Sequence, residues 1–177
     1  MNKAIFLDRD GVINHTVFRM GKPRAPYTFE EFSFIDGVSA SIKAFKEAGY
    51  LIIVVTNQPD VSRGWVSRAQ VDLINDHVKS CLPVDEIMAC FHVDQDDCQC
   101  RKPRPGMLIE ASKKWGIDLS QSFMVGDRVS DVEAGLKANC KTVLISESPL
   151  LTSEIQAHHQ SSSLIEASHW ILSFGTV

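Results

Sequence analysis

The stretch that decides the fold is Lys3-Ala-Ile-Phe-Leu-Asp-Arg-Asp-Gly11, close to the start of the 177-residue sequence. Its apolar run, Ala4 to Leu7, is typical of a strand buried in a parallel sheet. Asp8 and Asp10 follow at once, and they face the same way because alternate residues of a strand point to one side. Two adjacent carboxylates repel each other unless one is protonated or a cation lies between them. The stretch therefore predicts a site for a divalent metal, which would also attract a phosphate, although the motif alone also fits a solvated acidic turn.

The composition is that of one globular domain, which we expect to span residues 1–177. Apolar residues make up 44% of the chain, and its net charge is -4 with a pI near 5.8. An acidic chain has no broad basic surface, so we expect no binding to nucleic acid or to acidic membranes. No apolar run reaches the ~18 residues that suggest a membrane span, and the first residues do not form a signal peptide. We expect a cytoplasmic protein, and we expect it to be a monomer.

Apolar runs alternate with amphipathic segments along the chain. Further strands are expected at 50–55, 87–91, 123–125 and 142–145. Helices are expected at 37–48 with Asp36 as its cap, 67–79, 105–115 and 131–138, and a helix or strand at 164–172. The segment from Val12 to Ile35 has the composition of a long loop or small flap. This alternation predicts an α/β fold with right-handed crossovers and a mainly parallel sheet covered on both faces.

Polar side chains follow three of the expected strands at the point where each strand ends. Asp8 and Asp10 follow the first strand, Thr56 and Asn57 the second, and Asp127 the fourth. In parallel sheets, ligands bind beyond the carboxyl ends of the strands, where the strand order reverses. We therefore expect these side chains to meet at one edge of the sheet.

Four motifs occur in order along the chain: Asp8-x-Asp10-Gly11, Thr56-Asn57-Gln58, Lys102, and Gly126-Asp127 with Asp131. They resemble the four motifs of the haloacid dehalogenase-like phosphohydrolases, and the resemblance covers nearly the whole chain. It implies a three-layer, Rossmann-like fold with a minimal cap domain or none. It also implies a phosphatase that acts on a small phosphorylated metabolite.

The resemblance assigns catalytic roles to the motif residues. Asp8 would be the nucleophile that forms an aspartyl-phosphate. Asp10 would protonate the leaving oxygen and then take a proton from the attacking water. Thr56 and Lys102 would hold the phosphoryl oxygens, where charge is stabilised in the transition state.

The resemblance also implies a catalytic Mg²⁺. Its ligands would be the carboxylates of Asp8 and Asp127 and the backbone carbonyl of Asp10, and oxygen donors of this kind suit a hard cation. The metal would cancel the repulsion between an anionic nucleophile and an anionic substrate. Asp131 would orient Lys102 or a metal-bound water.

A second group of metal-binding residues lies in the middle of the chain. Cys90-Phe-His92 and Cys98-Gln-Cys100 supply three thiols and one imidazole at close spacing. A Cys₃His set is a complete tetrahedral zinc site, closed to water and therefore structural in type. The alternative is that Cys90 is a buried strand residue and the other two are free loop thiols. Zinc binding would fix the loop that leads directly to Arg101.

The sequence looks most like two groups of these phosphohydrolases, the D-glycero-D-manno-heptose 1,7-bisphosphate 7-phosphatases and the histidinol-phosphate phosphatases. The resemblance rests on Asp-Arg-Asp-Gly-Val-Ile-Asn at 8–14, Thr-Asn-Gln, the cysteine motif followed by Arg-Lys-Pro, and Pro-Gly-Met at 105–107. We favour the heptose group because Arg101 can pair bidentately with the second phosphate of a bisphosphate. Asn57 and Arg128 are also expected to bind the substrate.

Other functions stay open at this point. Pro59 and Asp60 stand where the heptose group commonly has Ser-Gly, which stiffens the loop and adds a negative charge. The zinc loop contains Asp94, Asp96 and Asp97, which would suit the cationic amine of histidinol. A DNA 3′-phosphatase of similar fold is a further alternative, but the chain lacks a basic stripe. A non-catalytic, zinc-stabilised binding module is the last alternative, and the intact catalytic motifs argue against it.

Overall fold

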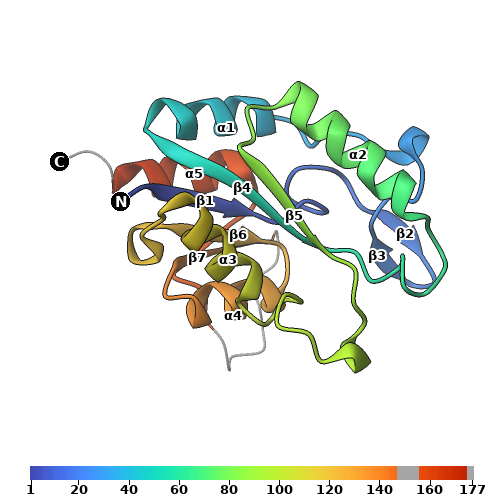
Figure 1. Ribbon diagram of the computed structural model, residues 1–177. Coiled ribbons are helices and arrows are strands. Elements are labelled where there is room, and N and C mark those ends of the chain that lie inside the picture. Colours follow the sequence, from blue (N-terminus) through green and yellow to red (C-terminus); the bar gives the residue numbers. More distant parts are fainter. Residues whose placement is uncertain (147–155, 175–177) are drawn as a thin grey trace.

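A central sheet runs through the molecule (Figure 1), and six strands of the described chain form it. The computed structural model describes residues 1–146 and 156–174. The strands are β1 (Lys3–Leu7), β4 (Tyr50–Asn57), β5 (Glu86–Cys90), β6 (Phe123–Gly126), β7 (Lys141–Ile145) and β8 (His159–Ser161). Their order is β5-β4-β1-β6-β7-β8, and each neighbouring pair is parallel. The expected parallel sheet is therefore confirmed.

Helices cover both faces of this sheet. They are α1 (Val38–Glu47), α2 (Arg68–Cys81), α3 (Gly106–Trp115), α4 (Val129–Lys137) and α5 (Leu164–Ser173). Helices α1 and α5 pack together on one face, whereas α3 and α4 lie on the other (Figure 1). Within the described ranges, no helix is long and apolar enough to cross a membrane. The architecture is the three-layer α/β fold that the sequence predicts.

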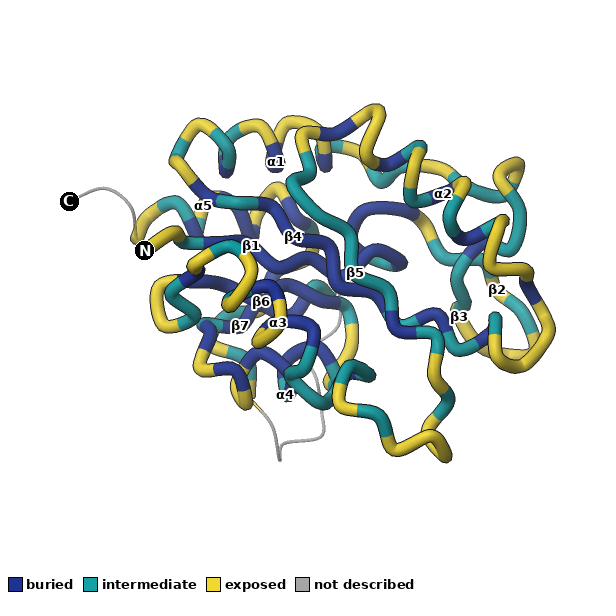
Figure 2. Tube along the Cα trace, viewed as in Figure 1, coloured by how far each residue is buried: buried dark blue, intermediate teal, exposed yellow. Residues whose placement is uncertain are grey.

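Alternate residues of β1 enter the two cores that lie on opposite faces of the sheet. Ile5 and Leu7 pack with α1 and α5, whereas Ala4 and Phe6 pack with α3. This follows from the two-residue period of a strand, and it explains why a central parallel strand is apolar at every position. Figure 2 shows the buried strands running through the centre of the molecule.

Strand β1 lies where the order of the strands reverses. From β1, the chain adds β4 and β5 on one side and β6, β7 and β8 on the other. Leu7, the last residue of β1, is in register with Val54 of β4 and Val125 of β6. The residues that follow these three positions therefore meet at one edge of the sheet, where ligands bind in folds of this kind.

The segment from Val12 to Ile35 is more regular than the sequence predicts. It contains an antiparallel hairpin of β2 (Val17–Arg19) and β3 (Lys22–Arg24), followed by a 3₁₀ turn at Phe29–Glu31. Each of these strands has only three residues, and Pro23 lies in the second. Because a proline in a short run argues against a strand, the sequence pattern gives no signal for this hairpin.

Other details also differ from expectation, most of them at the ends of elements. Strand β4 continues to Asn57, so Thr56 and Asn57 are its last residues and do not follow it. Helix α1 is preceded by Gly37 at φ 79° with no side-chain cap, and a Cβ there would lie 2.1 Å from Ile165 Cδ1. The prediction that the Asp36 side chain caps this helix is therefore wrong. The tail forms helix α5, and the short polar strand β8 before it was not expected.

Replacement of Phe45 should test the core beneath α1. Its ring is fully buried, so Phe45→Ala is expected to lower the free energy of unfolding by about 3–5 kcal/mol because truncation leaves a cavity. The control Phe18→Ala should change it by less than about 0.5 kcal/mol, since Phe18 is 75% exposed on β2. Urea unfolding followed by circular dichroism measures both variants. Equal losses would contradict the packing of α1 against the sheet.

Candidate active site

The carboxylate of Asp8 lies at the carboxyl end of β1, at the reversal point of the sheet. Its backbone N–H donates to the Val125 carbonyl of β6 at 2.9 Å, which fixes the residue beside that strand. Oδ1 of the carboxylate is 3.0 Å from Lys102 Nζ and accepts from the Arg9 N–H at 2.8 Å. Both of these contacts go to Oδ1, so neither of them occupies Oδ2.

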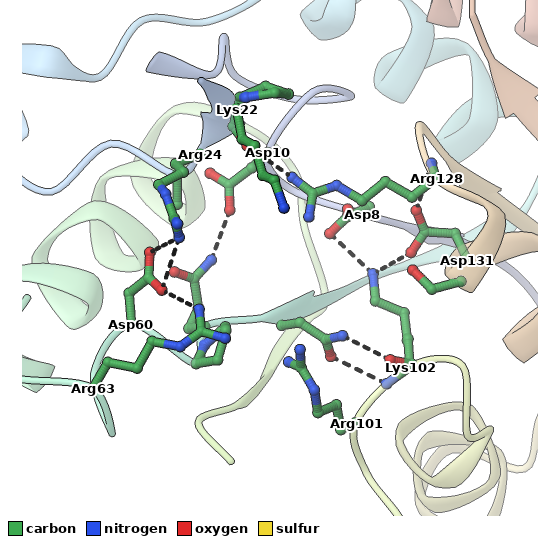
Figure 3. Close-up of a pocket in the computed structure, with 16 residues that line it drawn as sticks. Asp8, Asp10, Lys22, Arg24, Asp60, Arg63, Arg101, Lys102, Arg128 and Asp131 are labelled. Atoms are coloured by element: carbon green, nitrogen blue, oxygen red, sulfur yellow. Dashed lines mark hydrogen bonds and ion pairs between the residues drawn. The ribbon is translucent and has the colours of Figure 1, made fainter. Parts of the chain in front are cut away.

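Lys102 joins three elements at the floor of the site (Figure 3). Its buried ammonium is 2.6 Å from Asp131 Oδ1, 3.0 Å from Asp8 Oδ1 and donates to the Val55 carbonyl at 2.7 Å. Burial by itself lowers the pKa of Lys102, but the two carboxylates more than offset this and raise that pKa above its ordinary value. The side chain is therefore a permanent cation beside Asp8.

Asn57 positions the backbone that carries Lys102. Its Nδ2 donates to the Lys102 carbonyl at 3.0 Å, and its Oδ1 accepts from the Lys102 N–H at 3.1 Å. This pair of hydrogen bonds joins the end of β4 to the loop before α3. Asn57 also lines the cavity, and the substrate-binding role expected from the sequence stays a prediction.

Asp10 is held by three side chains that the sequence reasoning left without a role. The fully buried Arg9 forms an ion pair with Asp10 Oδ1 at 3.1 Å, and Asn14 Nδ2 donates to the same oxygen at 3.0 Å. Gln58 Nε2 donates to Asp10 Oδ2 at 2.7 Å. The motifs at 8–14 and 56–58 contain all three residues, but only the folded geometry shows what they contact.

Thr56 directly precedes Asn57, which lines the cavity, and is fully buried. Its hydroxyl accepts a hydrogen bond from Gln58 Nε2 at 2.8 Å. Thr56 is not among the described residues that line the cavity. The structure thus places it next to Gln58, and its contact with a phosphoryl group stays a prediction.

Asp127 completes a cluster of acids at this edge. Carboxylate oxygens of Asp8, Asp127 and Asp131 all lie within 4.8 Å of one another. Gly11 allows this approach, because its φ is +92° and a Cβ there would lie 2.3 Å from Asp127 Oδ2. Asp127 Oδ1 is buried and makes no hydrogen bond within residues 1–146 and 156–174; Arg128 Nε is 3.8 Å away.

Burial raises the pKa values of two of these acids, Asp8 and Asp127. Burial raises the pKa of Asp8 to about 7, an effect that Lys102 opposes and the neighbouring carboxylates reinforce. Burial also raises the pKa of Asp127 to about 6, and Asp131 reinforces that shift. Carboxylates gathered in this way favour a divalent cation among them.

The cavity above these residues has a volume of about 260 Å³. Of the residues that the structure describes, four acids line it, and so do six basic side chains: Lys22, Arg24, Arg63, Arg101, Lys102 and Arg128. Arg101 Nε donates to Asp94 Oδ1 at 2.7 Å, and its buried Nη1 has no hydrogen-bond partner in the described chain. Arg128 is half exposed and donates to the Pro23 carbonyl at 3.4 Å. A cavity of this charge fits an anionic ligand.

The four expected zinc ligands come together beside the cavity. Cys100 Sγ lies 3.1 Å from Cys90 Sγ, 3.5 Å from Cys98 Sγ and 3.3 Å from His92 Nδ1. Cys90 ends β5, and the other three belong to the loop that leads to Arg101. The sequence-based grouping of these residues agrees with their positions in space.

The doubly wound parallel sheet, the strand-end Asp-x-Asp and the lysine buried between two carboxylates define the class of haloacid dehalogenase-like hydrolases. The HAD-hydrolase-like family model matches residues 99–167. A D-glycero-beta-D-manno-heptose-1,7-bisphosphate 7-phosphatase of Haemophilus influenzae is 38% identical over 166 residues, covering 87% of this chain and 87% of the relative. The corresponding enzyme of Helicobacter pylori is 35% identical, covering 85% of this chain and 88% of the relative. This chain belongs to the family of the D-glycero-D-manno-heptose-1,7-bisphosphate 7-phosphatases.

A solved structure agrees with this assignment. The D,D-heptose 1,7-bisphosphate phosphatase of B. bronchiseptica, crystallised with magnesium and phosphate, superimposes with a TM-score of 0.85 and 26% identity. The match covers 97% of this chain and 99% of that chain.

The raised pKa values predict how stability depends on pH when metal ions are removed. A folded-state pKa of about 7 for Asp8, against 3.8 ordinarily, means that the folded protein binds more protons than the unfolded chain between about pH 4 and 7. Stability should therefore fall as the pH rises through this window. Thermal unfolding in a chelator, from pH 4.5 to 7.5, should show a smaller fall for Asp8→Asn than for the wild type. Parallel curves would contradict the shift.

Proposed function

We propose that this protein is a magnesium-dependent phosphatase that removes the 7-phosphate of D-glycero-D-manno-heptose 1,7-bisphosphate through an aspartyl-phosphate. The observation that carries the proposal is the ion-paired group of Asp8, Lys102 and Asp131 at the floor of a cation-lined cavity. It places a nucleophile, a fixed positive charge and room for a sugar phosphate together. The named activity of the relatives supplies the substrate.

Magnesium is the cation that we propose at the carboxylates of Asp8 and Asp127 and the backbone carbonyl of Asp10. The donors fit a hard ion, because they are oxygens and Asp127 Oδ1 is buried without a hydrogen bond from the described residues. When bound, the ion would supply positive charge that offsets the repulsion between Asp8 and the phosphate dianion. The magnesium and phosphate in the B. bronchiseptica enzyme support this assignment.

Asp8 begins the reaction. We infer that Oδ2 attacks phosphorus in line with the leaving oxygen, because the contacts of the carboxylate with Lys102 and Arg9 both go to Oδ1. The P–O bond to the sugar breaks as the Asp8–P bond forms. Lys102, which its raised pKa keeps protonated, stabilises charge on the equatorial oxygens of the phosphoryl group.

Asp10 handles the protons in both steps. It donates a proton to the sugar oxygen as the P–O bond breaks, and it then takes a proton from the water that hydrolyses the aspartyl-phosphate. Its orientation is fixed by Arg9, Asn14 and Gln58. These three therefore act as positioning residues, since they contact Asp10 rather than the reacting atoms.

The zinc-loop acids do not support an amine-containing substrate. Asp94 pairs with Arg101, Asp97 pairs with Arg104, and Asp96 Oδ2 accepts from the Val93 N–H at 2.8 Å. None of these acids is among the described residues that line the cavity. The three acids that would suit the amine of histidinol phosphate thus bind groups of their own loop and not the cavity.

We further propose that Cys90, His92, Cys98 and Cys100 bind a structural Zn²⁺. Zinc–sulfur bonds of ~2.3 Å in a tetrahedron place sulfur atoms ~3.8 Å apart. The separations of 3.1, 3.5 and 3.7 Å among the three Sγ atoms are close to that arrangement. Because Cys100 directly precedes Arg101, the metal would hold the guanidinium group at the cavity wall.

Loss of the nucleophile should abolish turnover. Asp8→Asn keeps the size of the side chain but removes its negative charge, so kcat should fall at least ~10³-fold. Release of inorganic phosphate from heptose 1,7-bisphosphate, histidinol phosphate and an aryl phosphate, with Mg²⁺ present, measures this. The wild type should prefer the bisphosphate. A larger kcat/KM for histidinol phosphate would overturn the proposed substrate, and Mg²⁺-independent turnover would overturn the proposed metal.

Zinc and Arg101 can be separated by two variants. The purified protein should contain one zinc per chain by elemental analysis, and Cys98→Ser should lose it.

Arg101→Ala should keep the zinc but lower kcat/KM for the bisphosphate at least ~10-fold more than for an aryl phosphate, because a charge-assisted contact is lost. Arg104→Ala is the control, since this arginine pairs with Asp97 in the same loop but does not line the cavity. Equal losses on both substrates would show that Arg101 does not contact the second phosphate.

A further inference from the structure

The β2–β3 hairpin forms one wall of the cavity, and a second polar cluster lies at this wall (Figure 3). Its centre is Asp60, which is 6% exposed and lies two residues beyond Gln58. Arg63 Nη1 is 2.7 Å from Asp60 Oδ1, and Tyr27 donates its hydroxyl to Oδ2 at 2.8 Å. Arg24 of β3 reaches both oxygens through Nη1 at 3.4 Å. One carboxylate thus holds two guanidinium groups.

The charge of Asp60 therefore does not face the substrate alone. Its single negative charge offsets one of the two arginines, which leaves the cluster of Arg24, Asp60 and Arg63 with a net positive charge. Lys22, from the same strand as Arg24, lines the cavity too and adds a further positive charge. The hairpin wall is consequently cationic without any metal, and it can bind an anion.

The contacts of the Arg24 guanidinium leave one of its N–H donors without a hydrogen bond to the described residues. Its guanidinium lies over the Trp65 ring, 4.7 Å from the centroid, and its Nη1 is directed to Asp60. Its Nε is buried and has no hydrogen-bond partner within the described chain. A buried donor without a partner is rare in proteins, and a ligand that accepts its hydrogen bond would account for it. Arg24 also lines the cavity, so a ligand bound there lies next to its guanidinium group.

We propose that Arg24 determines specificity by binding the anionic group of the substrate that is remote from the reacting phosphate, with Asp60 as its positioning residue. The inference deepens the proposed function, and it rests on that function for the identity of the substrate. The ligand class is a phosphate monoester, because a planar guanidinium held on one edge can still offer paired donors to a tetrahedral oxyanion. Arg24 and Arg101 would then contact this group from two walls of the cavity.

Kinetics of Arg24→Ala test the inference. KM for heptose 1,7-bisphosphate should rise about 10- to 100-fold while kcat changes little, because the lost contact is present before and during the reaction. Arg24→Lys should recover part of the loss, since the charge remains but the paired donors do not. Asp60→Asn should raise KM in the same direction by freeing Arg24. Melting temperatures of all variants report whether they fold.

A second measurement does not depend on the heptose. Glucose 1,6-bisphosphate and inorganic phosphate are used as inhibitors of aryl phosphate hydrolysis. Arg24→Ala should raise Ki for glucose 1,6-bisphosphate at least ~10-fold more than Ki for inorganic phosphate. Arg68→Ala is the control, because this arginine pairs with Asp72 on α2 and lies outside the cavity. It should move neither value.

The outcomes separate the two proposals. If the two Ki values change equally in Arg24→Ala, or neither changes, the role of Arg24 is overturned. If the wild type does not turn over heptose 1,7-bisphosphate but the Ki for glucose 1,6-bisphosphate still depends on Arg24, the proposed substrate is overturned and the role of Arg24 stands.

Discussion

The buried ammonium of Lys102 is the charge on which the arrangement of the site depends. Breaking a buried ion pair costs about 3–5 kcal/mol, because the remaining charge is left without a partner in a medium of low polarity. Lys102 finds its partners on different elements: Asp8 after β1, Asp131 in α4 and the Val55 carbonyl in β4. These elements meet only in the observed strand order, so the order of the strands is what brings Lys102 and its three partners together.

Much of this could be predicted from the sequence, because its physical basis is local. Central parallel strands are apolar at every position, so β1, β4 and β6 are visible as apolar runs, and the residues at their ends can be assigned to one edge. Contacts made by tertiary geometry could not be predicted. Nothing in the composition indicates that Asn57 bonds to the backbone of a residue 45 positions away, or that Gln58 holds Asp10. The hairpin leaves no signal in the sequence, because its three-residue strands are too short to show a two-residue period.

The departure at Pro59 and Asp60 illustrates how such contacts alter the meaning of a residue. Taken from the sequence, an acid in this loop opposes the binding of a phosphorylated ligand. In the structure, Asp60 is surrounded by Arg24, Arg63 and Tyr27, and two of these come from the segment before α1. The acid thus fixes positive charge at the cavity wall instead of opposing it. The hairpin and the loop after β4 are best understood as one unit, since each supplies the counter-charge of the other.

The groups that we propose to face the reacting phosphate and those that we propose to face the rest of the substrate are held in place by different means. Asp8, Asp10 and Lys102 are fixed by strand ends and by the packed core. Arg101 and Arg24 belong to segments that are not part of the six-stranded sheet. Their positions therefore depend on individual ion pairs, that of Arg101 with Asp94 and that of Arg24 with Asp60. Each pair occupies part of a guanidinium and leaves a buried nitrogen, Nη1 of Arg101 and Nε of Arg24, without a partner among the described residues. Loops of this kind vary readily between related proteins. A shared catalytic floor can therefore serve different phosphate monoesters, while the walls select among them.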